Sequence, residues 1–123
     1  TEISKKLRVF AQSLKGREQI AVEEFASALE FIPVTLAENA GLDPLDILTE
    51  LRVNHDSGNK NHGLNLFSNR VEDTMSKGII EPLSVKKQAI NSASEVAIMI
   101  LRIDDVIASN REQSGGSRMG DYD

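Results

Sequence analysis

The chain has 123 residues, a net charge of −5 and no cysteine, and 40% of its residues are apolar. This length predicts a single domain. The missing cysteines exclude disulfides and thiol catalysis, and without a basic stripe the chain is a poor candidate for nucleic-acid binding. No apolar run reaches the roughly 18 residues that a membrane helix needs. Since aromatic residues make up only 4% of the chain, the core must use aliphatic side chains, which favours packed helices.

The first forty residues predict two amphipathic helices. Ile3, Leu7, Phe10 and Leu14 recur at helical spacing and define one apolar face. Gly16 is expected to end this helix. In the second helix, the apolar residues are expected to face inward: Ile20, Ala21, Phe25, Ala28, Leu29 and Ile32. The polar ones are expected to face outward: Glu23, Glu24, Ser27 and Glu30.

A helix–turn–helix is predicted around Gly41. Gly41 suits the left-handed position that closes a helix. Asp43 is a candidate N-cap for the next helix, and Pro44 fits its first position. Apolar residues then carry this third helix toward His55.

The second half of the chain predicts a hairpin and one long helix. Apolar residues on both sides of residues 68–70 indicate two short strands. The longest helix is expected from Pro82 through Ile100. The β-branched segment Asp105–Ser109 is interpreted as a C-terminal strand, and the polar residues 110–123 as a disordered tail.

Two segments carry candidate binding chemistry, each with a structural alternative. Glu81, at the start of the long helix, could compensate the helix dipole, or it could hydrogen-bond the vicinal hydroxyls of a ribose. In Gly63–Phe67, the glycine permits close backbone approach, and Asn65 offers both a donor and an acceptor. Such a pair can bind an adenine edge, but the same residues also suit one arm of a hairpin.

Other chemistries find little support. A zinc site at His55 and His62 would need further ligands that the sequence does not provide. The pair Asp104-Asp105 could hold a cation, although an exposed edge or pairing with basic groups suits it better. Nothing fixes a Ser-His-Asp arrangement, and no phosphate-binding glycine loop is present. We therefore assign no metal ligand and no catalytic residue.

Four short segments of the sequence, in this order, resemble those of a known family. The chain is similar to the C-terminal part of the equatorial domain of group II chaperonins, the family of the archaeal thermosome and the eukaryotic cytosolic chaperonin. The similar segments are Leu36-Ala37-Glu38-Asn39-Ala40-Gly41-Leu42-Asp43, Gly78-Ile79-Ile80-Glu81-Pro82, Gln88-Ala89-Ile90 and Ile98-Met99-Ile100-Leu101-Arg102-Ile103-Asp104-Asp105-Val106-Ile107.

The resemblance implies a mainly α fold: the helical half of an equatorial domain, with a short β-hairpin and a C-terminal edge strand. Residues 1–109 would form the C-terminal segment of this ATP-binding domain. Glu81 matches the family's ribose contact. The residues expected beside the adenine base are Asn65, Leu66, Phe67, Ile79 and Ile80.

The family's phosphate-binding loop, its Gly-Asp-Gly-Thr-Thr motif, its catalytic aspartates and its client-binding domain have no counterpart here. Other parts of the subunit would hold the Mg²⁺ of ATP, and this segment alone should not hydrolyse ATP. The implied partners are other subunits of a cytoplasmic double ring and, through the missing domains, unfolded protein clients; neither nucleic acid nor membrane is expected. The alternative is a free-standing helical protein-interaction module with no nucleotide role.

Overall fold

The computed structural model describes residues 1–113, and it describes the side chains of residues 1–103. Two compact units are present, Thr1–Ile80 and a second unit that begins at Glu81. The first unit contains three helices and a two-stranded sheet, and the second contains one long helix. The predicted mainly α fold with a short hairpin is confirmed.

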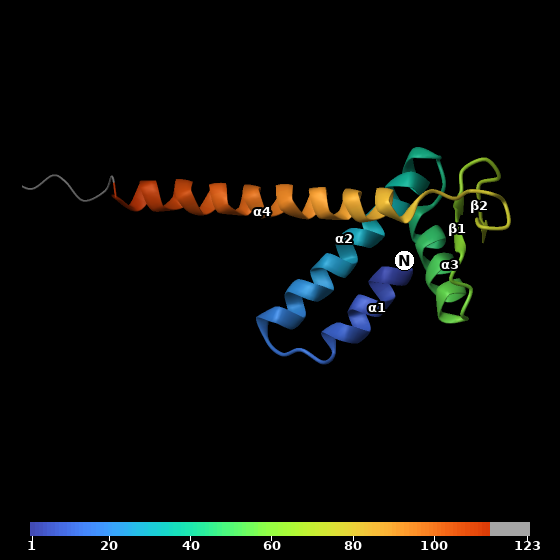
Figure 1. Cartoon of the computed structure of the whole chain (residues 1–123), viewed down its shortest axis with the longest axis horizontal. Coiled ribbons are helices and arrows are strands. Elements are labelled where there is room, and N and C mark those ends of the chain that lie inside the picture. The colour runs from blue at the N-terminus through green and yellow to red at the C-terminus, as the bar shows by residue number, and fades with distance from the viewer. Residues whose placement is uncertain (114–123) are drawn as a thin grey trace, which may run out of the picture. The chain divides into compact units, whose positions relative to one another are not determined.

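Helices α1 (Glu2–Ala11) and α2 (Arg17–Asn39) lie side by side and are joined by a short loop (Figure 1). Gly16 adopts a φ of 65° and is the N-cap residue of α2, so α1 ends earlier than its apolar pattern predicts. The buried residues of α1 are the small Ser4 and Ala11. Small side chains at a helix contact let the two backbones approach closely.

The predicted helix–turn–helix is confirmed in detail. Gly41 has a φ of +71°, and the N–H of Leu42 donates to the carbonyl of Ala37 at 2.9 Å, which closes α2. The carboxylate of Asp43 accepts from the N–H groups of Leu45 and Asp46 at 2.9 and 3.1 Å. These two bonds satisfy amides that a helix start leaves without partners, and α3 (Pro44–Asp56) begins there.

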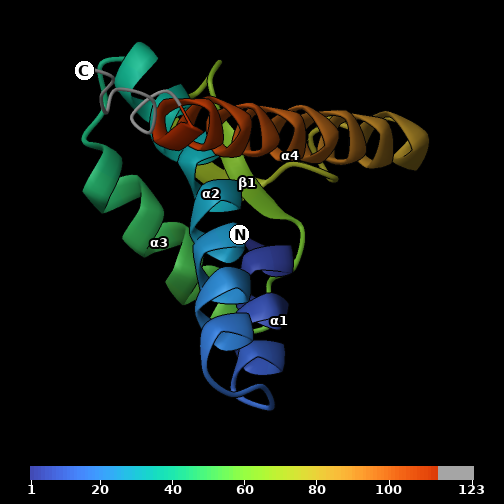
Figure 2. The ribbon, with the colours of Figure 1, turned by 90° about the vertical axis from the view of Figure 1, so that its left-hand side faces the viewer.

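The hairpin consists of β1 (His62–Asn65) and β2 (Arg70–Asp73), which pair antiparallel. Helix α3 contacts both strands as well as α2, and Figure 2 shows α3 and α1 beside α2. A small apolar core lies where α2, α3 and the hairpin meet. Its members are Ala37, Ile47 and Leu51, with the half-buried Leu42, Leu64 and Val71 packed against them.

The inward face predicted for α2 is wrong for this chain. Ile20 and Ile32 are both 60% exposed, whereas Ala26, Glu30 and Ala37 are buried. The side of α2 that packs on α1 and α3 is the side with small residues and one carboxylate. The apolar side has no cover among the described residues, so periodicity alone selected the wrong face.

Helix α4 (Leu83–Gln113) forms the second unit and is longer than expected. The predicted C-terminal strand is wrong, because Asp105–Ser109 continue α4. A helix satisfies its backbone hydrogen bonds within itself, whereas a strand needs a neighbouring strand. Of the predicted tail, residues 110–113 belong to α4, and 114–123 lie outside the described residues. None of the described helices is long and apolar enough to cross a membrane.

Candidate functional site

Asn65 holds the tip of the hairpin in place. It is only 7% exposed, and its side-chain oxygen accepts from the N–H of Phe67 at 2.9 Å. Its amide nitrogen donates to the carboxylate of Glu72 at 2.6 Å. Glu72 also accepts from Ser68, and these two hydrogen bonds, Ser68 first, lower the pKa of Glu72. The hairpin itself therefore uses much of the hydrogen-bonding capacity of Asn65.

The two residues after Asn65 present apolar surface. Phe67 is 96% exposed, and Leu66 is also exposed. The backbone N–H of Phe67 is fixed by Asn65, so the turn fixes the main chain that carries the ring. A flat, exposed aromatic ring on a fixed backbone can stack against another flat apolar group.

Ile79 and Ile80 follow a turn at the other end of the hairpin. Gly78 has a φ of +72°, and the N–H of Ile79 donates to the carbonyl of Thr74 at 2.9 Å. Thr74 in turn donates to the carbonyl of Asn61, just before β1. Because the strands separate this turn from the tip, the two sets of apolar residues lie beyond opposite ends of the paired strands. Ile79 and Ile80 are both exposed.

Glu81 belongs to the second unit, so the six predicted residues are divided between the two units. Its carboxylate forms an ion pair with Lys86, one turn into α4, and its side chain is 41% exposed. An exposed carboxylate with one ammonium partner retains acceptor sites for hydroxyl groups. The ion pair also fixes the charge of Lys86 near the start of α4.

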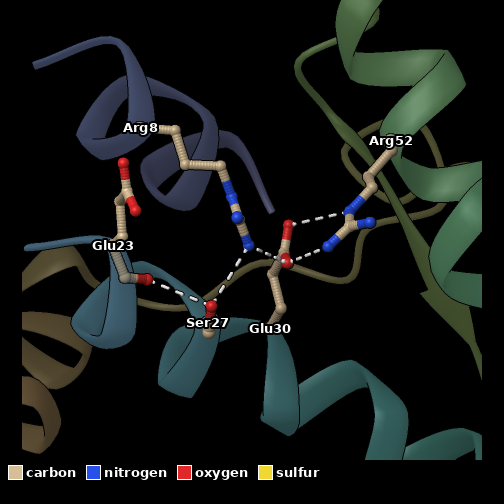
Figure 3. Close-up of polar contacts among 5 residues, drawn as sticks. All are labelled: Arg8, Glu23, Ser27, Glu30 and Arg52. Carbon is tan, nitrogen blue, oxygen red and sulfur yellow. Dashed lines mark hydrogen bonds and ion pairs between the residues drawn. The ribbon is translucent and has the colours of Figure 1, made fainter. Parts of the chain in front are cut away.

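A charged cluster in the first unit was missed by sequence reasoning (Figure 3). Glu30 on α2 accepts hydrogen bonds from Arg8 on α1 at 2.7 Å and from Nε of Arg52 on α3 at 3.2 Å. Its side chain is 6% exposed. Burial would raise the pKa of Glu30, but the hydrogen bonds and charge of Arg52, together with the charge of Arg8, outweigh it, so this pKa is lowered. The cluster connects three helices.

A cleft of about 370 Å³ lies beside this cluster. Arg8, Arg52 and Lys5 line it together with the carboxylates of Glu30 and Asp56. Each cation has a carboxylate partner, since Lys5 pairs with Asp56 at 3.3 Å. Because Arg8 and Arg52 share the carboxylate of Glu30, the side chains of the cleft carry one more positive than negative charge. Among the described residues no group of three or more potential ligands could hold a metal ion.

Comparison with known proteins places the chain in a family. The model of the TCP-1/cpn60 chaperonin family matches residues 1–111. The chain belongs to that family. Thermosome subunit beta of Thermoplasma acidophilum is 59% identical over 88% of this chain, and thermosome subunit 1 of Haloferax volcanii is 57% identical over all of it. The predicted relationship to group II chaperonins is confirmed.

The solved structures agree with this assignment. The open-state monomer of a group II chaperonin from Methanococcoides burtonii matches with a TM-score of 0.80 and 58% identity, covering 82% of this chain and 25% of that one. The fold is that of a fragment of the chaperonin equatorial domain. The chain spans only 20% and 22% of the two thermosome subunits.

Two buried polar residues of this chaperonin segment, Glu30 and His55, were not identified as such from the sequence. Glu30 was expected outside because a carboxylate at an outward helical position is usually solvated. One signal for its burial was available: Glu30 stands one turn after Ala26 and two turns before Ala37, on a face of small residues. His55 had been considered only as a metal ligand.

Proposed function

We propose that the chain is the C-terminal equatorial segment of an ATP-dependent chaperonin subunit that folds other proteins in a cytoplasmic double ring. The segment supplies the adenine and ribose side of the nucleotide pocket and part of the ring contacts. The observation that carries this proposal is 57% identity to a thermosome subunit over the whole chain, of which the chain represents about a fifth. Clients would bind through domains outside this segment.

The exposed apolar surface supports a segment that needs cover from elsewhere. On α4, consecutive apolar side chains are about half exposed or more; they include Val96, Ile98, Met99, Ile100, Leu101 and Ile103. Consecutive residues point in different directions around a helix, so this part of α4 is apolar on several sides. Such a helix is normally surrounded by protein. This surface favours a subunit segment over a free-standing interaction module, whose exterior would be polar.

The exposed side chains of each unit, considered separately, have chemistry that suits one end of ATP. Phe67, Ile79 and Ile80 offer exposed apolar surface for a base. The carboxylate of Glu81 is accessible to the two hydroxyls of a ribose. Asn65 contributes by fixing the backbone of Phe67, and its remaining amide N–H is a further donor.

In the part of the segment that the structure describes, no residues match the phosphate end of ATP. Neither a glycine-rich phosphate loop nor a group of potential metal ligands occurs among the described residues. Mg²⁺, the phosphates and the catalytic groups are therefore assigned to other parts of the subunit. ATP supplies the free energy for the folding cycle when it is bound there.

The test is nucleotide affinity of the full-length subunit measured by calorimetry. Replacing Glu81 by Ala should weaken ADP binding about tenfold, because two hydroxyl contacts to a charged acceptor are lost. Lys86→Ala is the matched control, since it breaks the same ion pair but keeps the carboxylate. Equal affinities of wild type and Glu81→Ala would remove Glu81 from the site.

A further inference from the structure

His55 connects three elements of the first unit. The residue lies in the last turn of α3 and is 4% exposed. Its Nδ1 is 3.0 Å from a carboxylate oxygen of Glu2 in α1, and its Nε2 is 2.9 Å from the backbone carbonyl of His62 at the start of β1. One side chain thus joins the first helix to the first strand of the hairpin.

Both partners of the ring are hydrogen-bond acceptors. A neutral imidazole carries one N–H and can donate to only one of them. The doubly protonated ring carries two and can donate to both. Two acceptors, at 3.0 and 2.9 Å, are therefore both satisfied only by the ring form that carries two N–H groups. The carboxylate of Glu2 compensates the positive charge of that form directly at 3.0 Å.

The surrounding charges come from several elements. Lys5 of α1 donates to the backbone carbonyl of His55 at 2.8 Å, which holds α1 to α3 independently of the ring. The pKa of Glu2 is lowered, first by its hydrogen bond with His55 and against the effect of burial. Glu2 is therefore ionised at mildly acidic pH. The other charged side chains around the cleft beside His55 are Arg8, Glu30, Arg52 and Asp56, and the amino group of Thr1 also lines it.

We propose that His55 is a positioning residue whose doubly protonated ring ties β1 to α1, and that this link is lost as the ring is deprotonated. We refer to His55, Glu2 and the His62 carbonyl as the His55 bridge. Strand β1 ends at Asn65, which fixes Phe67, so the bridge sets the position of the hairpin arm that leads to the base-contacting residues. Its consequence for nucleotide binding rests on the proposed function; its structural part does not.

The test is amide hydrogen exchange of residues 62–73 in the full-length subunit. Rates are measured from pH 5.5 to 8, where imidazoles ordinarily titrate, and are corrected for intrinsic exchange. Protection of the hairpin should fall about tenfold as pH rises, the effect of losing one charged hydrogen bond. Protection is expected to fall as pH rises because only the charged ring can make both hydrogen bonds. A flat profile in the wild type would overturn the proposal.

Glu2→Gln separates this titration from a general effect of pH. A glutamine can donate its amide N–H to Nδ1 of a neutral ring, while Nε2–H still donates to the His62 carbonyl. Both links then survive at high pH, and the tenfold step should disappear. An unchanged step in Glu2→Gln would contradict the proposal. Should this variant fail to fold, His55→Gln provides the same test, because it keeps a donor near Nε2 and cannot titrate.

His62→Gln is the matched control. His62 joins the bridge only through its backbone carbonyl, so this variant should keep the wild-type step. Loss of the step in His62→Gln would show that the side chain of His62, and not His55, causes it, and would contradict the proposal.

ADP affinity measured over the same pH range connects the bridge to function: it should weaken with rising pH in wild type and not in Glu2→Gln. If Glu81→Ala leaves ADP binding unchanged, the proposed nucleotide role of Glu81 fails, whereas the exchange profile still decides the role of His55.

Discussion

Glu30 of α2 and Arg52 of α3 form an ion pair in which only one partner is withdrawn from water. The carboxylate is 6% exposed, whereas the side chain of Arg52 is 48% exposed. Arg8 of α1 approaches the same carboxylate from another helix. The buried group therefore has two cations that are themselves still hydrated, an arrangement that avoids much of the cost of burying both charges.

Replacing Glu30 by Ala should lower the local stability of helices α1–α3 by about 2 kcal/mol. The reason is that Arg8 and Arg52 lose their common acceptor, but both can turn toward solvent, so the cost stays below that of a fully buried pair. Amide exchange of these helices in the full-length subunit measures the effect. Glu24→Ala on the exposed side of α2 is the control and should change little. Equal effects of the two substitutions would show that the cluster contributes nothing.

The same cluster predicts a response to acid. The pKa of Glu30 is lowered below its usual 4.5, so its contribution is fully present above about pH 4.5 and is lost as pH falls through the lowered value. Glu30→Gln cannot titrate. The stability difference between wild type and Glu30→Gln should be constant from pH 7 to 5 and should shrink below pH 4.5. A stability difference between the two proteins that grows as the pH falls below 4.5 would contradict this prediction.

Gly63→Ala should destabilise the hairpin by about 1–2 kcal/mol. An added Cβ would lie 2.9 Å from Cγ2 of Thr74, whose hydroxyl donates to the carbonyl of Asn61. Exchange of residues 62–73 is the measurement. In a Thr74→Ser background the hydroxyl remains and Cγ2 is gone, so Gly63→Ala should cost less there. If the cost is the same in both backgrounds, this steric contact is not its cause.

The chain studied alone should self-associate, because many apolar side chains among residues 1–103 are exposed. Sedimentation velocity between 1 and 100 μM should show mass increasing with concentration. Replacing Ile100 and Ile103 on α4 by Gln, two exposed apolar residues one turn apart, should reduce the association. A monodisperse, cooperatively melting wild-type monomer would contradict the expectation.

Local signals in the sequence predicted the structure well where neighbouring residues decide it. The corner at Gly41 and Asp43 is an example, because a left-handed glycine and an N-cap act within a few residues. The hairpin was also predicted, since the apolar residues on its two arms and the polar turn between them are close in sequence.

Predictions failed where partners far away in the chain, or outside it, decide the outcome. Whether Ile32 or Glu30 faces the interior depends on which helices pack on α2, and periodicity cannot show that. Asp105–Ser109 can form a strand only beside another strand, so composition alone could not exclude the helix found. Of the candidate site, the sequence indicated Asn65 but not its partner Glu72, which the register of the hairpin places opposite Gly63, two residues before Asn65.

The Glu30 cluster also has a consequence for the order of folding during synthesis. Its three members lie within residues 8–52, and the corner between α2 and α3 is set by residues 37–46 alone. Contacts between successive elements close small loops and form quickly. The three helices can therefore assemble on a nascent chain before the hairpin and α4 have left the ribosome.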